Sequence, residues 1–175
     1  MTTLSDLEQW FSPERLAPYR KACHGHGNRA AELYTWNADI SAALWRTLGH
    51  LEILLRQTMH ARLLTWSRAQ HRDDRWYLAI DRQLTNRARL DIQDARQRAT
   101  RDGKAETPGR VVAELNLGFW RYLLSSHYER ILWLACLRGS FPQLPGLRKH
   151  VERPVAELHR LRNRLAHRES PVSGR

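Results

Sequence analysis

The chain has 175 residues, of which 42% are hydrophobic and 27% charged, and its mean hydropathy is −0.64. A length of this order suits one domain with a substantial core, and the composition excludes a disordered chain. No apolar run approaches the roughly 18–20 residues that span a bilayer, and the opening sequence MTTLSDLEQW is too polar for a signal peptide. Two cysteines far apart do not form a disulfide framework. We therefore expect a cytoplasmic protein that has no membrane partner.

The formal net charge is +11, and arginine supplies nearly all of the positive charge. Such an excess favours a polyanionic partner, nucleic acid first and an anionic membrane surface second. Arginine in particular binds phosphate with two parallel hydrogen bonds and stacks on bases. A composition rich in arginine and poor in lysine is also typical of a high-GC genome. The charge alone leaves both explanations open.

The first 29 residues form a peripheral segment in which Pro13 and Pro18 interrupt the helical pattern. The stretch Cys23-His24-Gly25-His26-Gly27 contains residue types that bind zinc. It lacks a second ligand pair at a usable spacing, and its glycines are typical of a turn. We predict a mobile connector here, and neither a metal nor a cofactor.

Residues 30–70 contain no proline and a single glycine, Gly49. Apolar residues recur through this stretch at helical spacing, which predicts the longest helix of the chain, about 35–40 residues, bent near Gly49. Glu52 and Arg56 lie four residues apart in the order that favours an ion pair. Glu52 also borders the apolar stripe, so a partner arginine on another helix is the alternative.

A charged helix is predicted over residues 85–100, and polar residues 101–109 form a loop after it. Residues 110–124 are dense in apolar and aromatic side chains, which indicates core. The inner side of the charged helix comprises Leu84, Ala88, Ile92, Ala95 and Ala99. The many arginines of this helix are interpreted first as a face exposed to solvent. Contact with phosphate is the second interpretation.

Residues 128–137 predict a short apolar helix that stops at Arg138-Gly139. The final helix is predicted over residues 147–167, with a kink or break before Pro154, and residues 170–175 as a frayed tail. Alternating strand patterns and internal repeats are absent from the sequence. We predict a single all-α domain over residues 1–175, a bundle of four to five main helices with one long helix.

An arginine in this last helix lies on its apolar stripe. Val151, Val155, Leu158 and Leu165 mark one face, and Arg162 falls in the middle of their arc. A guanidinium keeps its proton, and its burial without a partner is costly. Arg162 is therefore expected to be paired or to serve chemistry.

Two further polar residues share a face next to this stripe. On an ideal helix Asn163 lies about 100° and His167 about 140° around the axis from Arg162. Arg162 and His167 are then too far apart to touch one small group. They can line opposite walls of a cleft, converge if the helix frays, or meet their counterparts across a dimer axis.

The stretch Arg162-Asn163-Arg164-Leu165-Ala166-His167 matches the R-(polar)-x-x-x-H motif of HEPN-domain ribonucleases, and the chain most resembles the Abi-like proteins of bacterial abortive-infection systems. Four blocks in order carry the resemblance, and together they extend over most of residues 30–169. These blocks are residues 50–56, 108–115, 117–124 and 161–169. The chain departs from the usual Abi-like pattern at Gln57, where an asparagine is common.

This resemblance implies a HEPN-like helical bundle that forms a homodimer, in which two motifs build one composite site. It also implies metal-independent RNA cleavage and a toxin role in antiviral defence, restrained by an antitoxin that is a protein or a small RNA. Attack of a ribose 2′-OH on its own phosphate would leave a 2′,3′-cyclic phosphate and a 5′-hydroxyl. The requirement for a 2′-OH would restrict the substrate to RNA.

The residue types fit that reaction. His167 suits the general base or acid, Arg162 suits stabilisation of the phosphorane charge, and Asn163 can orient His167. The supporting or RNA-binding residues that we expect are Glu52, Arg56, Arg164 and Arg168.

Other interpretations of the motif remain. The helix macrodipole stabilises cations near a helix C-terminus. This effect explains Arg164 and Arg168 but fits Arg162 poorly. A non-catalytic RNA-binding or RNA-sensing module would use the same basic surface. A DNA-binding regulator would need a helix-turn-helix, for which the sequence offers no clear candidate.

Overall fold

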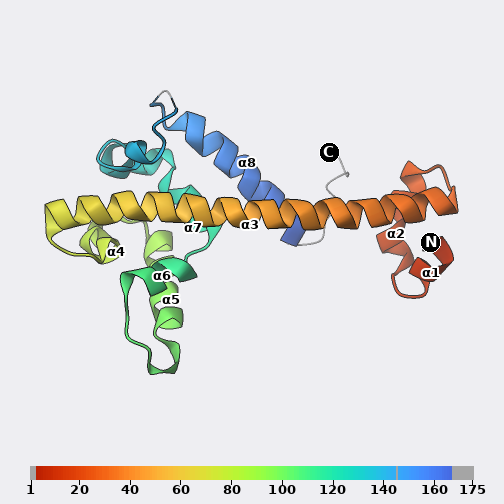
Figure 1. Ribbon diagram of the computed structural model, residues 1–175, viewed down its shortest axis with the longest axis horizontal. Helices are drawn as coiled ribbons and strands as arrows, with labels where there is room; N and C mark the ends of the chain where they lie inside the picture. Colours follow the sequence, from red (N-terminus) through yellow and green to blue (C-terminus); the bar gives the residue numbers. More distant parts are fainter. Residues whose placement is uncertain (1–2, 145, 167–175) are drawn as a thin grey trace. The chain divides into compact units, whose positions relative to one another are not determined.

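The computed structural model describes residues 3–144 and 146–166, and every regular element within these ranges is helical (Figure 1). The predicted all-α fold is confirmed. Within these ranges four α-helices have ten residues or more. They are α2 (Pro13–Ala22), α3 (Gly27–His71), α5 (Asn86–Ala99) and α8 (Lys149–Ala166). No helix in the described part of the chain is both long and apolar enough to cross a membrane.

The chain forms two compact units. The first comprises the residues up to Gly49 and those from Arg160 onward, and the second comprises His50–His159. Each unit therefore contains one part of α3 and one part of α8.

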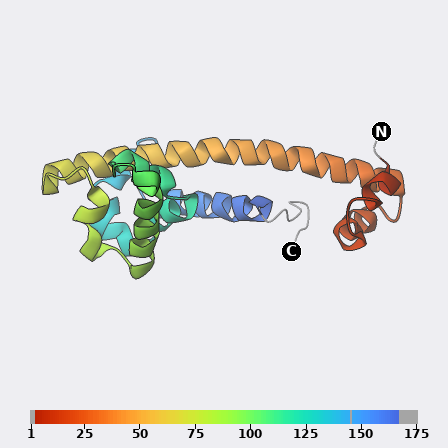
Figure 2. The same ribbon diagram turned by 90° about the horizontal axis from the view of Figure 1, so that it is seen from below.

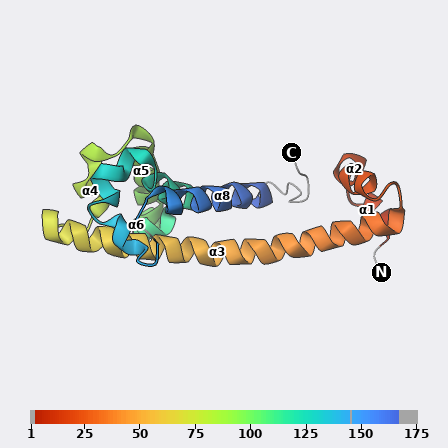
Figure 3. The same ribbon diagram turned by 90° about the horizontal axis from the view of Figure 1, so that it is seen from above.

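In the first unit, α1 (Leu4–Glu8) and α2 lie beside the N-terminal end of α3 (Figures 1 and 3). Leu7, Leu16 and Ala31 form the centre of a small core there. Ser12 caps α2 by accepting a hydrogen bond from the Arg15 N–H. Pro18 lies inside α2, so the predicted interruption at that residue is wrong.

The connector between α2 and α3 has the backbone of a turn. His24 and Gly25 adopt left-handed φ angles of 50° and 81°, a conformation that glycine reaches without steric cost. The helix that follows, α3, has 45 residues and continues through Gly49. It is longer than predicted because it already begins at Gly27, within the stretch assigned to the connector.

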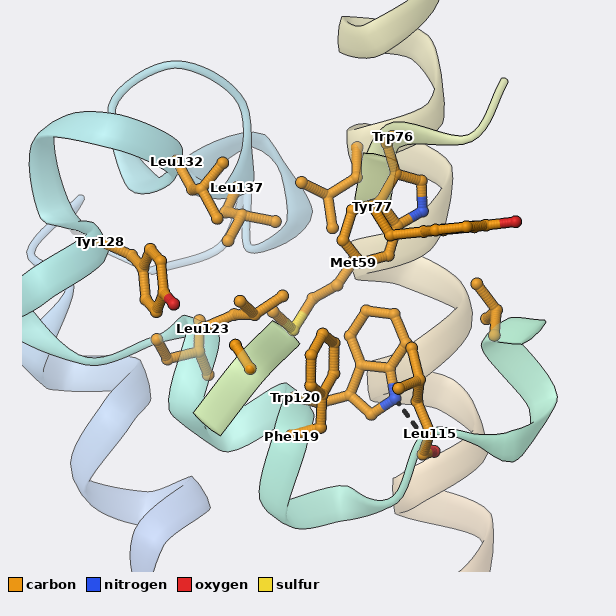
Figure 4. Close-up of a cluster of buried hydrophobic side chains, with 14 of the residues drawn as sticks. Met59, Trp76, Tyr77, Leu115, Phe119, Trp120, Leu123, Tyr128, Leu132 and Leu137 are labelled. Carbon is orange, nitrogen blue, oxygen red and sulfur yellow. Dashed lines mark hydrogen bonds between the residues drawn. The ribbon is translucent and has the colours of Figure 1, made fainter. Parts of the chain in front are cut away.

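The main hydrophobic core belongs to the second unit. Here α4 (Trp76–Ala79), α5, α6 (Pro108–Glu114) and α7 (Leu117–Leu123) gather at the C-terminal end of α3 (Figures 1 and 2). Met59 of α3 packs among Trp76, Phe119 and Trp120, all essentially buried (Figure 4). The Trp120 indole N–H donates to the Leu115 carbonyl at 3.3 Å. The prediction that residues 110–124 belong to the core is confirmed for most of their apolar members, whereas Ala113 is exposed and Tyr122 half-buried.

Helix α5 follows its predicted pattern closely. The five residues assigned to its inner side (Leu84, Ala88, Ile92, Ala95 and Ala99) are all buried. Several of its arginines form ion pairs with neighbouring segments: Arg96 binds Glu106 at 2.9 Å, and Arg98 binds Glu114 at 3.1 Å. These contacts attach the 101–107 loop and the end of α6 to α5, so this part of the basic face has a structural function.

The prediction of one short helix over residues 128–137 is wrong. The chain forms a 3-10 turn (Ser126–Tyr128), a π-type turn (Glu129–Trp133) and a second 3-10 turn (Leu137–Ser140). Both types of turn depart from the period of 3.6 residues on which the prediction depends. Leu132 and Trp133 of the π-type turn are both buried.

The expected break in the last helix is also absent. Pro154 lies inside α8, which continues from Lys149 to Ala166. Proline has a fixed φ that is compatible with a helix, so the helix continues although Pro154 removes the hydrogen bond to the His150 carbonyl. The end predicted at His167 and the frayed tail lie outside the described residues.

Candidate functional site

Arg162 lies on α8 in the first unit, half-buried as its place on the apolar stripe predicts. Its guanidinium carbon is 5.2 Å from the centroid of the Trp45 ring on α3. This is a cation–π contact, worth about 0.5–1 kcal/mol at an exposed position. Trp45 itself is 45% exposed. Sequence analysis did not identify Trp45, and an exposed tryptophan within a helical pattern was the signal that could have found it.

The stack leaves the hydrogen-bonding groups of Arg162 available. Among the described residues of this unit, no carboxylate lies within ion-pair distance of it; the ion pair there joins Arg20 to Glu8. A ring neighbour does not occupy the five N–H donors of a guanidinium in the way that a carboxylate does. Arg162 thus lies beside an aromatic ring with donors left for an anion.

The structure describes some, but not all, of the remaining motif residues. Asn163 and Arg164 are half-buried on the same turn, and neither is without an interaction partner. Leu165 is buried. His167 and Arg168, the expected general base or acid and a supporting cation, lie outside the described residues.

A cavity of about 220 Å³ lies in the same unit. It is lined by residues from the three helices α2, α3 and α8. The lining residue of α8 lies within the Arg162–Ala166 part of the motif. The lining comprises Arg15 and Tyr19 of α2; Tyr34, Asn37, Ala38 and Ser41 of α3; and Leu165 of α8.

The polar groups of this cavity are held by hydrogen bonds. The Asn37 side-chain amide donates to the Tyr19 hydroxyl at 2.8 Å, and the Ser41 hydroxyl donates to the Asn37 carbonyl at 2.6 Å. Asn37 is only 8% exposed. Sequence analysis missed this site because it assigned α2 to a peripheral segment. The available signal was the polar row Tyr34, Asn37 and Ser41, whose spacings of three and four place it on one face of α3.

Glu52 and Arg56 lie in the second unit, and the ion pair expected between them is wrong: no such pair joins these two described residues. Arg56 instead donates from Nη1 to the Ala113 carbonyl of α6 at 3.0 Å. A carbonyl in the last turn of a helix lacks an intrahelical donor and carries the negative end of the dipole. The guanidinium therefore satisfies a backbone group, which connects α3 to α6.

The described part of the chain contains no group of three or more His, Cys, Asp or Glu residues that could hold an ion. No protein-family model, curated protein or solved structure matches the chain.

Proposed function

We propose that this protein is a metal-independent endoribonuclease of the abortive-infection toxin type, with a composite Arg-x4-His site built from two copies of the chain. The observation that carries the proposal is the state of Arg162. It is half-buried, held against Trp45, and has no carboxylate within ion-pair distance among the described residues of its unit.

The proposed reaction needs three contributions. A base removes the proton of the ribose 2′-OH, which attacks the adjacent phosphorus; an acid protonates the departing 5′-oxygen; and a cation stabilises the phosphorane. His167 supplies the proton transfers, with the second imidazole of the dimer available for the opposite role. Arg162 supplies the positive charge, and Asn163 orients the imidazole or a phosphate oxygen. The products are a 2′,3′-cyclic phosphate and a 5′-hydroxyl.

The stack on Trp45 supports this assignment of Arg162. Catalysis by charge gains most when the charged group is already oriented before the transition state forms. An aromatic neighbour restricts where the guanidinium lies without taking the place of an anion at its N–H donors. In a toxin of this type, an antitoxin protein or small RNA would act by covering this surface.

The direct test uses purified protein with labelled single-stranded RNA and DNA in EDTA. We expect RNA cleavage that is abolished by His167→Ala and by Arg162→Ala. His150→Ala and Arg153→Ala change exposed residues of the same helix and serve as matched controls, which should cleave normally.

The alternatives give different results. RNA binding without cleavage, unchanged in His167→Ala, would exclude the nuclease and leave a non-catalytic RNA-binding module. Cleavage that strictly requires Mg²⁺ would exclude the proposed mechanism. Cleavage of DNA as well as RNA would exclude attack by the 2′-OH.

A further inference from the structure

The cavity of the first unit has dimensions that suit one small planar group. Its volume of about 220 Å³ is below the roughly 300–1,000 Å³ of clefts that hold whole drug-sized ligands. A single heterocyclic base fits such a space, whereas a run of nucleotides does not.

Its aromatic residues provide a stacking surface that is already ordered. The Tyr34 ring is held by two neighbours: its centroid lies 5.2 Å from that of Phe11 and 5.3 Å from that of Tyr19. A ring fixed in this way loses little conformational freedom when a base stacks on it. Stacking on aromatic side chains is a common way for proteins to bind unpaired bases.

Its polar residues match the edges of a base. The Asn37 amide donates to the Tyr19 hydroxyl, which fixes the orientation of both groups, and Asn37 has a further interaction partner as well. Amide and hydroxyl groups include both donors and acceptors, the two kinds of group that base edges present. Arg15 is an exposed member of the lining and is not the arginine that pairs with Glu8. Its guanidinium is suited to a phosphate that accompanies the base.

The cavity and the motif share one turn of α8. Leu165, which lines the cavity, is three residues after Arg162 and two before His167. A nucleotide whose base occupies the cavity would thus present its phosphate close to the motif. We infer that this cavity binds one unpaired base of the RNA, beside the phosphate that Arg162 engages. The inference rests on the proposed function for the identity of the polymer.

Four substitutions separate the contributions to binding. Ala38→Phe fills the cavity from an exposed position and should leave the fold intact. Tyr34→Leu removes the stacking surface, and Tyr34→Phe retains it. Trp36→Leu changes an exposed aromatic residue of the same helix that does not line the cavity. Far-UV circular dichroism checks that each variant keeps its helical content.

The experiment scans an abasic ribose along a single-stranded RNA. Fluorescence anisotropy measures affinity in a His167→Ala background, so that the RNA stays intact. We expect the loss of one particular base to weaken binding about fivefold or more, the equivalent of one stacked base. The same loss should have little effect once Ala38→Phe or Tyr34→Leu is present, and its full effect in Tyr34→Phe and Trp36→Leu.

The outcomes for the cavity and for the nuclease are separable. An abasic position whose effect is the same in the parent and in Ala38→Phe overturns the cavity inference, even if wild-type protein cleaves RNA. Coupling between one base and the cavity without cleavage by wild-type protein supports the inference and overturns the nuclease. Absence of RNA binding overturns both.

Discussion

At the scale of single residues, Arg162 shows how an aromatic neighbour can replace an acidic one. A carboxylate beside it would have neutralised the charge, whereas the Trp45 ring 5.2 Å away orients the guanidinium and leaves its charge in place. If that orientation serves catalysis, the tryptophan acts as a positioning residue.

Replacement of Trp45 by leucine should therefore slow RNA cleavage without abolishing it. The cation–π contact is worth about 0.5–1 kcal/mol, which corresponds to a decrease in kcat of about two- to fivefold. Trp36→Leu changes another exposed tryptophan of α3 and is the control. Single-turnover kinetics over a range of protein concentrations measures the maximal rate and the half-saturating concentration separately. An effect on KM alone would mean that Trp45 contacts the RNA instead of positioning Arg162.

His60 gives the second unit a pH-dependent stability. The indole N–H of Trp76 donates to His60 Nδ1 at 3.0 Å, which requires that nitrogen to be unprotonated. Burial, and secondly the charge of Arg68, lower the pKa of His60 below its usual value. The unfolded chain, with a histidine pKa of about 6.5, then binds more protons than the folded chain between the two pKa values. The free energy of unfolding should consequently fall as the pH decreases below about 6.5.

Urea denaturation between pH 5 and pH 8 measures this dependence, and His60→Gln, which retains an acceptor for the indole, should flatten it. His60→Ala should lower the free energy of unfolding by about 1–3 kcal/mol at neutral pH, because the fully buried Trp76 loses its acceptor. Equal slopes for wild type and His60→Gln would show that other groups control the pH response.

At the scale of elements, the attachment of α6 to α3 depends on the contact from Arg56 to the Ala113 carbonyl. Arg56→Met removes the donor and keeps most of the apolar stem. We expect the free energy of unfolding to fall by about 1 kcal/mol while RNA affinity changes little. Arg46→Met, an exposed arginine on the same helix, should leave stability unchanged. A loss of RNA affinity with unchanged stability would restore the RNA-binding interpretation of Arg56.

Helical periodicity predicted those elements whose burial follows a single face. The inner side of α5 was predicted residue by residue, since a regular helix with one apolar stripe has only one way to bury it. Residues 126–140 could not be predicted in the same way. The chain there changes from a 3-10 turn to a π-type turn and back to a 3-10 turn, and apolar spacing at 3.6 residues per turn does not predict such changes.

The candidate site was predictable only where it is local in sequence. The position of Arg162 on the apolar stripe is a property of one helix, and the structure agrees with it. Its neighbour Trp45 and the cavity residues Tyr19 and Asn37 come from other helices. Contacts between helices depend on tertiary packing, and the spacing of residues along one helix does not predict that packing.

At the scale of the whole molecule, a motif that continued as one ideal helix would be too widely spread for the proposed reaction. Arg162 and His167 point about 140° apart on an ideal helix, so one phosphate cannot contact both across that arc. A homodimer solves this geometry because a two-fold axis places the arginine of one chain opposite the histidine of the other. Each copy then supplies the group that its partner cannot bring to the same phosphate.

This arrangement predicts complementation between two inactive proteins. Arg162→Ala and His167→Ala should each fail to cleave RNA, and a mixture that has exchanged subunits should regain activity, because the mixed dimer combines Arg162 of one chain with His167 of the other. Specific activity of the wild type should also fall on dilution below the dissociation constant of the dimer, measured in parallel by sedimentation. A mixture that stays inactive although mass spectrometry detects mixed dimers would place Arg162 and His167 of one chain in the same site. Full activity of a monomer would rule out the composite site.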